Sequence, residues 1–229
     1  MTLAEQAADR LRRALLHGAL PDRGPMTERI ACDFLGMSRT PVRAALQTLA
    51  NEGLLRHEPN RGYRIRRITP ETVIEAYQVR AVLEGLACRR LAEAGLPAPT
   101  HRTLETCVAE GYGMLAAADH RFDHDAWRAM NATFHATILK AAGSDILLGA
   151  IRQAEGVPLS SAQMMPTMHA EPDFALLRQS HVDHDRIFHA LANGQAIRAE
   201  RRMQEHVEVA GDIVVRRMEQ EADAAPRGA

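Results

Sequence analysis

The chain has 229 residues, of which 46% are hydrophobic and only 4% aromatic, and its formal net charge is −1. This length supports one large or two small domains with a sizeable core. Three scattered cysteines without a C-x-x-C pair, and the lack of a membrane-length apolar run, favour a reduced cytoplasmic protein over a disulfide-bonded or membrane-spanning one.

Charge is unevenly divided along the chain. Residues 1–67 contain twelve arginines and seven acidic residues, a net charge of +5, whereas the remainder carries −6. A basic N-terminal region is typical of proteins that bind nucleic-acid phosphates. We therefore expect a basic, nucleic-acid-binding domain at residues 1–68, a separate acidic domain at 69–221 and a disordered tail at 222–229.

The N-terminal part predicts a helix-turn-helix. A charged amphipathic helix at 3–17, which is not a signal peptide, precedes a short amphipathic helix at 26–35 and a Gly36-Met37 turn. The next helix begins at Ser38, a favourable N-cap residue. Its buried stripe is predicted to contain Val42, Ala45, Leu46 and Leu49. Arg39 and Arg43, four residues apart, share the opposite face, where arginine can contact guanine edges or phosphate.

Two short strands are predicted after this helix, at Gly53–His57 and Gly62–Arg66, with a basic turn between them. The second helix taken alone could be an ordinary surface helix with two solvated arginines. Helix, turn, helix and hairpin in this order indicate a winged helix-turn-helix that binds DNA.

These residues resemble the winged helix of the GntR family of bacterial transcription regulators. The resemblance rests on LLHGAL at 15–20, SRTPVRAAL at 38–46, NEGLL at 51–55 and PNRGY at 59–63. Ala44 replaces the glutamate usual in the family. The resemblance implies that operator DNA is contacted by Arg29, Ser38, Arg39, Thr40, Arg43, Asn60, Arg61 and Gly62, with the wing tip in the minor groove.

From residue 70 onward only helices are predicted, so the fold class is mainly α: a winged helix-turn-helix with a small β-hairpin, followed by an antiparallel bundle of six to seven helices. Thr69-Pro70-Glu71 is a helix-start signal, and all but one of the five later breaks contain glycine or proline, the exception being Asp119-His120. The expected spans are 70–94, 99–119, 123–142, 144–168, 173–193 and 195–221.

Several polar residues fall on the apolar faces of these helices. Asn131 and His135 are four residues apart on one face, and His184 and His206 lie on later apolar stripes. Neutral imidazoles that converge inside a bundle can bind a transition metal, although each one could equally be a hydrogen-bonded core residue. Five other histidines are expected at the surface or in loops: His120, His124, His169, His181 and His189.

Arg80 lies four residues before Glu84. It could form an exposed ion pair of little energetic value, or point into the bundle toward an acidic ligand.

The helical part resembles the FadR-type (FCD) C-terminal domain of the same family. The matching residues are 77–84, Phe134-His135 with Ile138-Leu139, and Asp183-His184 through His206. The resemblance implies a divalent transition metal (zinc, nickel or manganese) bound by Asn131, His135, His184 and His206, with Asn131 replacing the family's aspartate. It also implies that residues 69–221 form a ligand-binding and dimerisation domain, and that Arg80 pairs with the carboxylate of a small organic acid effector.

Together these features predict a homodimeric, metabolite-responsive regulator that binds double-stranded operator DNA, acts as a repressor and is not an enzyme. Two alternatives stay open at this point. One is a DNA-binding dimer whose bundle is purely structural; the other is a metal-dependent hydrolase.

Overall fold

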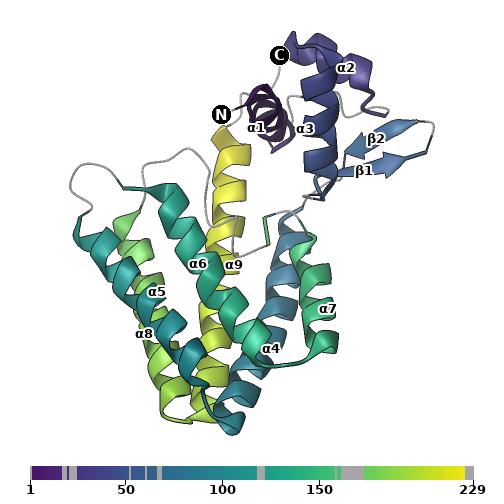
Figure 1. Cartoon of the computed structure of the whole chain (residues 1–229). Helices are drawn as coiled ribbons and strands as arrows, with labels where there is room; N and C mark the ends of the chain where they lie inside the picture. The colour runs from purple at the N-terminus through teal and green to yellow at the C-terminus, as the bar shows by residue number, and fades with distance from the viewer. Residues whose placement is uncertain are drawn as a thin grey trace. The chain divides into compact units, whose positions relative to one another are not determined.

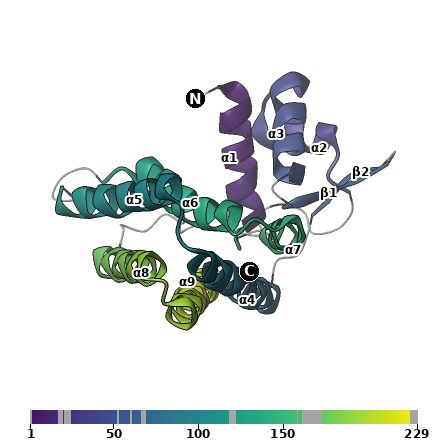
Figure 2. The same ribbon diagram turned by 60° about the horizontal axis from the view of Figure 1, so that its bottom comes forward.

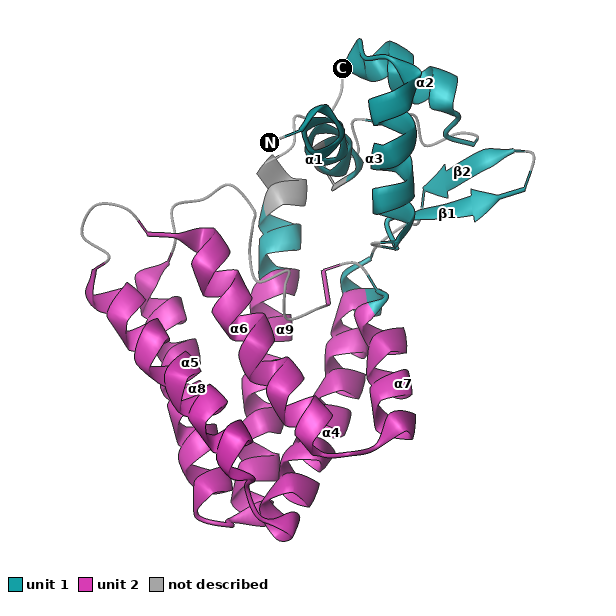
Figure 3. Cartoon of the chain, in the orientation of Figure 1, with its two compact units in different colours: residues 1–72, 156–158, 216–229 teal, residues 73–155, 159–215 magenta. Residues whose placement is uncertain are grey.

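A computed structural model describes residues 2–16, 20, 25–51, 53–59, 61–65, 69–117, 122–157, 159–160 and 173–224. These residues form nine helices and one two-stranded antiparallel sheet, which confirms the mainly helical fold class. Figure 3 colours the two compact units: unit 1 comprises residues 1–72, 156–158 and 216–229, and unit 2 comprises residues 73–155 and 159–215.

Unit 1 is a small helical domain with a hairpin (Figure 1). Its elements are α1 (Leu3–Leu16), α2 (Glu28–Leu35), α3 (Arg39–Asn51), β1 (Leu55–Glu58) and β2 (Gly62–Ile65). Both α1 and α2 pack against α3. The predicted stripe of α3 forms the centre of this core, since its residues are fully buried: Val42, Ala45, Leu46 and Leu49. The helix-turn-helix and the hairpin are therefore present as predicted.

The turn between α2 and α3 depends on local capping. The Thr27 hydroxyl accepts a hydrogen bond from the Ile30 amide at the start of α2. Gly36 ends the helix with φ of 65°, and its amide donates to the Cys32 carbonyl at 2.8 Å. These two caps fix the length of α2 and hence the start of α3.

Met26 belongs to the wing and not to α2, contrary to the predicted helix start. Its amide donates to the Tyr63 carbonyl at 2.6 Å and its carbonyl accepts from the Tyr63 amide at 2.9 Å. Gly62 permits this approach, because a Cβ there would lie 2.8 Å from the Met26 carbonyl oxygen, and its φ is 93°. The pairing between distant backbone segments overrides the amphipathic pattern of the sequence.

Unit 2 contains the main lengths of α4 (Pro70–Ala94) and α9 (Ala196–Ala224) with four helices between them. Those four are α5 (Ala98–Ala116), α6 (His124–Ala141), α7 (Asp145–Glu155) and α8 (Phe174–Ala192). In the view of Figure 2, α5 and α6 lie side by side in one layer, and α8, α9 and α4 form a second layer. No helix among the described residues is long and apolar enough to cross a membrane.

The helix predicted at 144–168 is shorter than expected, because α7 ends at Glu155. Gly156 and Pro158 explain this end: glycine favours helix termination, and the residue before a proline is disfavoured in the helical conformation. Leu159 then has a φ of 69°, which redirects the backbone. Residues 161–168 of the predicted span lie outside the described part of the chain. At the other end, α9 continues to Ala224, three residues into the predicted disordered tail.

Candidate functional site

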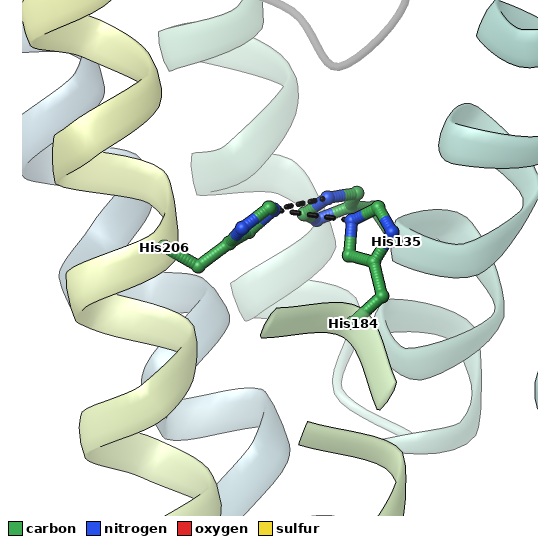
Figure 4. A group of neighbouring side chains, drawn as sticks. All are labelled: His135, His184 and His206. Carbon is green, nitrogen blue, oxygen red and sulfur yellow. Dashed lines mark hydrogen bonds between the residues drawn. The ribbon is translucent and has the colours of Figure 1, made fainter. Parts of the chain in front are cut away.

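Three histidines from different helices meet in the interior of unit 2 (Figure 4). The Nε2 atom of His206 on α9 lies 3.1 Å from Nε2 of His184 on α8 and 3.3 Å from Nε2 of His135 on α6. All three side chains are buried. The structure therefore brings together the three histidines that the sequence selected, and it does so through the same ring nitrogen in each.

Helical periodicity explains how these side chains are directed inward. His135 lies next to the buried Phe134 and three residues before the buried Ile138, and His206 lies between the buried Met203 and Val207. The ring of His184 stacks on Phe134 with centroids 4.4 Å apart. Apolar packing thus holds the three imidazoles rigidly around one point.

The spacing of the three nitrogens fits a transition metal. Zinc binds histidine nitrogen at about 2.0–2.1 Å in tetrahedral geometry, which places two such nitrogens about 3.3 Å apart. The two measured Nε2 separations, 3.1 and 3.3 Å, match this value.

Burial keeps the imidazoles of His184 and His206 neutral and able to act as ligands. Burial, followed by the neighbouring histidines, holds the pKa of His184 well below its usual range. The pKa of His206 is lowered to about 3, mainly by burial and secondly by His135. Their lone pairs are consequently available at neutral pH without loss of a proton.

Glu84 is a buried carboxylate that reasoning from sequence did not connect to the histidines. Its Oε2 lies 2.5 Å from Nδ1 of His135, and its Oε1 accepts hydrogen bonds from Nε of Arg80 at 2.8 Å and from a terminal nitrogen at 2.7 Å. Burial would raise the pKa of this carboxyl group, but Arg80 and His135 outweigh burial and lower it to about 2. Glu84 therefore stays ionised and orients the His135 ring.

Arg80 lies inside the bundle, which rules out the exposed ion pair as its setting. It is 2% exposed, and in addition to Glu84 it donates a short hydrogen bond to the Ser160 carbonyl. Its guanidinium carbon lies 5.1 Å from the centre of the Tyr77 ring, and the Tyr77 hydroxyl donates to the Leu159 carbonyl at 3.1 Å. Two consecutive backbone carbonyls are thus bound by the two side chains.

A small cavity adjoins the histidines. It measures about 10 Å³, which is room for roughly one water molecule or ion. Asn131, 3% exposed, is one of its lining residues, as is expected of a neighbour of a metal site. The lining consists of Tyr77, Arg80, Asn131, His135, Ser180, His206, Val207 and Ala210.

One histidine outside the predicted set is also buried. His181 is 0% exposed, so its predicted surface position is wrong. It lies one helical turn before His184, and its Nε2 is 2.8 Å from the Val108 carbonyl oxygen. His124 and His189 are exposed as expected, whereas His120 and His169 lie outside the described residues.

In unit 1, the predicted DNA-contacting residues lie on α2, α3 and the wing. Side chains of Arg29, Ser38, Arg39, Thr40, Arg43 and Arg61 are exposed, and Gly62 begins β2. Arg43 forms a two-point ion pair with Glu28 at 2.6 and 3.0 Å, which lowers the pKa of Glu28. Asn60 lies outside the described part of the structure.

A winged helix-turn-helix joined to an all-helical unit is the arrangement of a DNA-binding transcription regulator with a second, helical domain. Family models agree: residues 3–65 match "Bacterial regulatory proteins, gntR family", and residues 75–209 match "FCD domain". The chain belongs to the FCD-containing GntR family of transcription regulators.

Individual relatives are also regulators. The chain is 32% identical over 149 residues to a Paenarthrobacter nicotinovorans protein named "Probable D-xylose utilization operon transcriptional repressor", and the match covers 65% of this chain and 63% of that protein. It is 36% identical over 108 residues to an uncharacterized HTH-type transcriptional regulator of Agrobacterium vitis, with 47% and 62% covered. For both relatives the match spans less than two thirds of their length.

A longer match extends over most of both chains. The Escherichia coli HTH-type transcriptional repressor RspR is 26% identical over 204 residues, covering 89% of this chain and 85% of RspR. Among solved structures, Lar, said to control expression of the Listeria monocytogenes agr system, superposes with a TM-score of 0.69 at 16% identity, over 95% and 98% of the two chains. This last likeness concerns the fold alone.

Proposed function

We propose that this DNA-binding regulator is a repressor whose helical unit binds a divalent transition metal and, through it, a small organic acid that changes operator affinity. The observation that carries the proposal is the buried cluster of His135, His184 and His206. Names of relatives that include repressors support the sign of regulation.

The donor set suits zinc, nickel or manganese. Three neutral imidazoles would hold the ion, and the Asn131 amide oxygen would be a fourth, weaker ligand. Because none of these four ligands carries a negative charge, the ion would keep its full charge and attract an anion. When bound, such an ion supplies a Lewis-acid position for a carboxylate oxygen.

Arg80 would hold the second end of the effector by pairing with its carboxylate. The present cavity of about 10 Å³ is too small for an organic acid, and the Ser160 and Leu159 carbonyls occupy the Arg80 and Tyr77 donors. An effector would therefore compete with these two carbonyls and displace the backbone that carries them. That displacement couples effector binding to a change in the conformational population of the unit.

Homodimerisation is supported by an exposed apolar stripe on α4. Val79, Val82 and Leu86 recur at helical spacing and are 49%, 59% and 39% exposed. A second copy of the chain covering this stripe would bring two winged helices to a palindromic operator. We expect Val82→Glu to yield a monomer in multi-angle light scattering and Ile146→Glu, which charges an exposed apolar side chain on α7, to leave a dimer; a dimeric Val82→Glu variant would reject this interface.

The first test is metal content by elemental analysis on untagged protein purified without chelator. We expect about one equivalent per chain, lost in His135→Ala and His184→Ala but retained in His189→Ala, which alters an exposed histidine. No metal after supplementation would reject the metal site and direct attention to ligands held by Arg80 alone.

The second test separates the regulator from its two alternatives. Operator affinity is measured by fluorescence anisotropy with a panel of carboxylates and sugar acids, with and without metal. A metal-dependent change in affinity supports the proposal. Affinity indifferent to every acid would instead indicate a structural bundle, and ester or lactone turnover abolished by His135→Ala would indicate a hydrolase.

A further inference from the structure

Three buried ring nitrogens in the described part of unit 2 have no hydrogen-bond partner: Trp127 Nε1, His181 Nδ1 and His184 Nδ1. Their rings are neighbours. The His181 ring centre lies 5.6 Å from that of Trp127 and 5.7 Å from that of His184. Buried polar atoms are normally paired with protein or with ordered water, so three unpaired nitrogens in one place point to a shared arrangement.

The hydrogen bond of His181 to α5 determines which of its nitrogens can accept. Nε2 lies 2.8 Å from the Val108 carbonyl oxygen, and a carbonyl can only accept, so Nε2 carries the proton. Burial lowers the pKa of His181, which favours the neutral ring. In a neutral ring with a protonated Nε2, Nδ1 is a hydrogen-bond acceptor without a donor.

Close contacts with α5 hold the His181 ring in one position. A Cβ at Gly111 would lie 2.0 Å from Cε1 of His181, so the ring rests directly on the α5 backbone at a position that only glycine allows. On another side the Tyr112 ring meets it edge-on, with centres 4.6 Å apart. The sequence of α5 therefore accommodates an imidazole at this point.

Once His184 binds a metal, its Nδ1–H requires a hydrogen-bond acceptor. Its Nε2 faces the other two histidines, so Nε2 would be the ligand atom and Nδ1 would carry the proton. Metal-bound histidines almost always donate this second N–H to an outer partner. His135 has such a partner in Glu84, whereas the Nδ1 of His184 has none among the described residues.

We infer that His181 is a positioning residue for the metal centre: its Nδ1 accepts the Nδ1–H of His184, directly or through one bridging water, and so keeps the Nε2 lone pair of His184 directed at the metal. This inference rests on the proposed metal site. A bridging water would also accept from Trp127 Nε1 and donate to His181, which pairs all three nitrogens at once. The outer partner of His135 is then a carboxylate, Glu84, and that of His184 is an imidazole, His181.

The test compares zinc affinity of the full chain, by competition with a chromophoric chelator, in three variants. The His181→Phe variant keeps a ring packed against α5 but lacks a hydrogen-bond acceptor. We expect it to bind zinc about 10- to 100-fold more weakly. His181→Gln restores an acceptor and a donor and should recover most of that loss. The matched control is Tyr112→Phe, which keeps the ring on His181 and removes only a hydroxyl bonded to Asp185; its affinity should equal that of wild type.

A measurement on the wild type makes the test independent of folding in the variants. In long-range proton–nitrogen NMR spectra with added zinc, we expect His184 to be protonated at Nδ1 and bound through Nε2, and His181 to be protonated at Nε2. Zinc on Nδ1 of His184, or a His181→Phe variant with unchanged affinity, would overturn the inference while leaving the metal site intact. A wild-type chain that binds no zinc would instead reject the proposed metal site itself.

Discussion

The two units place similar arginine–glutamate pairs in opposite surroundings. In unit 1, Nε of Arg43 lies 2.6 Å from Glu28, with 67% of the arginine side chain exposed. In unit 2, a terminal nitrogen of Arg80 lies 2.7 Å from Glu84, with only 3% exposed. An exposed pair contributes little to stability and can be exchanged for a DNA phosphate, whereas a buried pair fixes one arrangement of its neighbours. The difference agrees with the proposed roles of the two units, reversible contact with DNA in unit 1 and metal binding by a rigid cluster in unit 2.

The largest expected effect comes from breaking the buried pair. Arg80→Met should lower the free energy of unfolding by about 3–5 kcal/mol, because it leaves the Glu84 carboxylate buried without its cation. Urea denaturation monitored by circular dichroism measures this loss. The control is Arg89→Met, which removes an exposed pair with Glu93 and should cost less than about 1 kcal/mol. Equal losses of unfolding free energy in Arg80→Met and Arg89→Met would contradict the difference between the buried and the exposed pair.

Acid should destabilise the metal-free protein through unit 2. The folded-state pKa values of His184 and His206 are lowered, so below their usual unfolded value of about 6.5 the unfolded chain binds more protons. Each neutral histidine therefore contributes fully to the free energy of unfolding above that pH. Between pH 6.5 and pH 5 this free energy falls by about 2 kcal/mol per histidine.

Urea denaturation in chelator at pH 7.5 and pH 5 measures this slope. His206→Phe should reduce it, since one of the histidines whose pKa is lowered by folding would then be absent. A slope of the opposite sign would mean that these histidines are charged in the folded state.

Substitutions of the exposed arginines on α3 in unit 1 should change DNA binding and leave the free energy of unfolding unchanged. Arg39→Ala and Arg43→Ala should each weaken operator binding by about 1–3 kcal/mol, the usual value of an arginine contact to a base. Fluorescence anisotropy at fixed salt measures affinity, and the urea midpoint checks that folding is unchanged. Arg12→Ala, in a partly exposed pair with Asp9 on α1, is the control. An unaffected affinity in both variants would move the DNA-binding face elsewhere.

The smallest effect is expected from removing Glu28, which competes with DNA phosphate for Arg43. Glu28→Gln takes away a negative charge that DNA phosphate would otherwise have to displace, so affinity should rise by less than about 1 kcal/mol. Titrations at several salt concentrations separate this change from altered base contacts. A tenfold loss of affinity would show instead that Glu28 holds Arg43 in the orientation that DNA requires.

Local signals in the sequence were sufficient for most of the fold. The Gly36 turn and the stripe from Val42 to Leu49 predicted the helix-turn-helix, because caps and periodicity act over a few residues. The early end of α7 also had a local signal, Gly156 with Pro158. The Met26–Tyr63 pairing had none, since backbone pairing between distant segments leaves no mark on side-chain pattern.

The site was only partly predictable for the same reason. His135, His184 and His206 could be selected from their helical faces, and His181 could have been, since it lies one turn before His184 on the same face as the buried Leu177. By contrast, the contact of His181 with Gly111 and that of Glu84 with His135 depend on how separate helices pack. Periodicity indicates which face is buried but not which neighbour it meets.

The Met26–Tyr63 pairing has a consequence for the operator. Two backbone hydrogen bonds join Met26, the residue before the α2 cap, to Tyr63 on β2, so the hairpin is attached directly to the start of the helix-turn-helix. For the predicted contacts, with α3 in the major groove and the wing tip in the minor groove, this attachment would set the distance along DNA between the two sets of bases. One inserted base pair shifts them by about 3.4 Å and also rotates them around the duplex. Spacing within each half-site should therefore be invariant among functional operators, even where the bases between the two contacts differ.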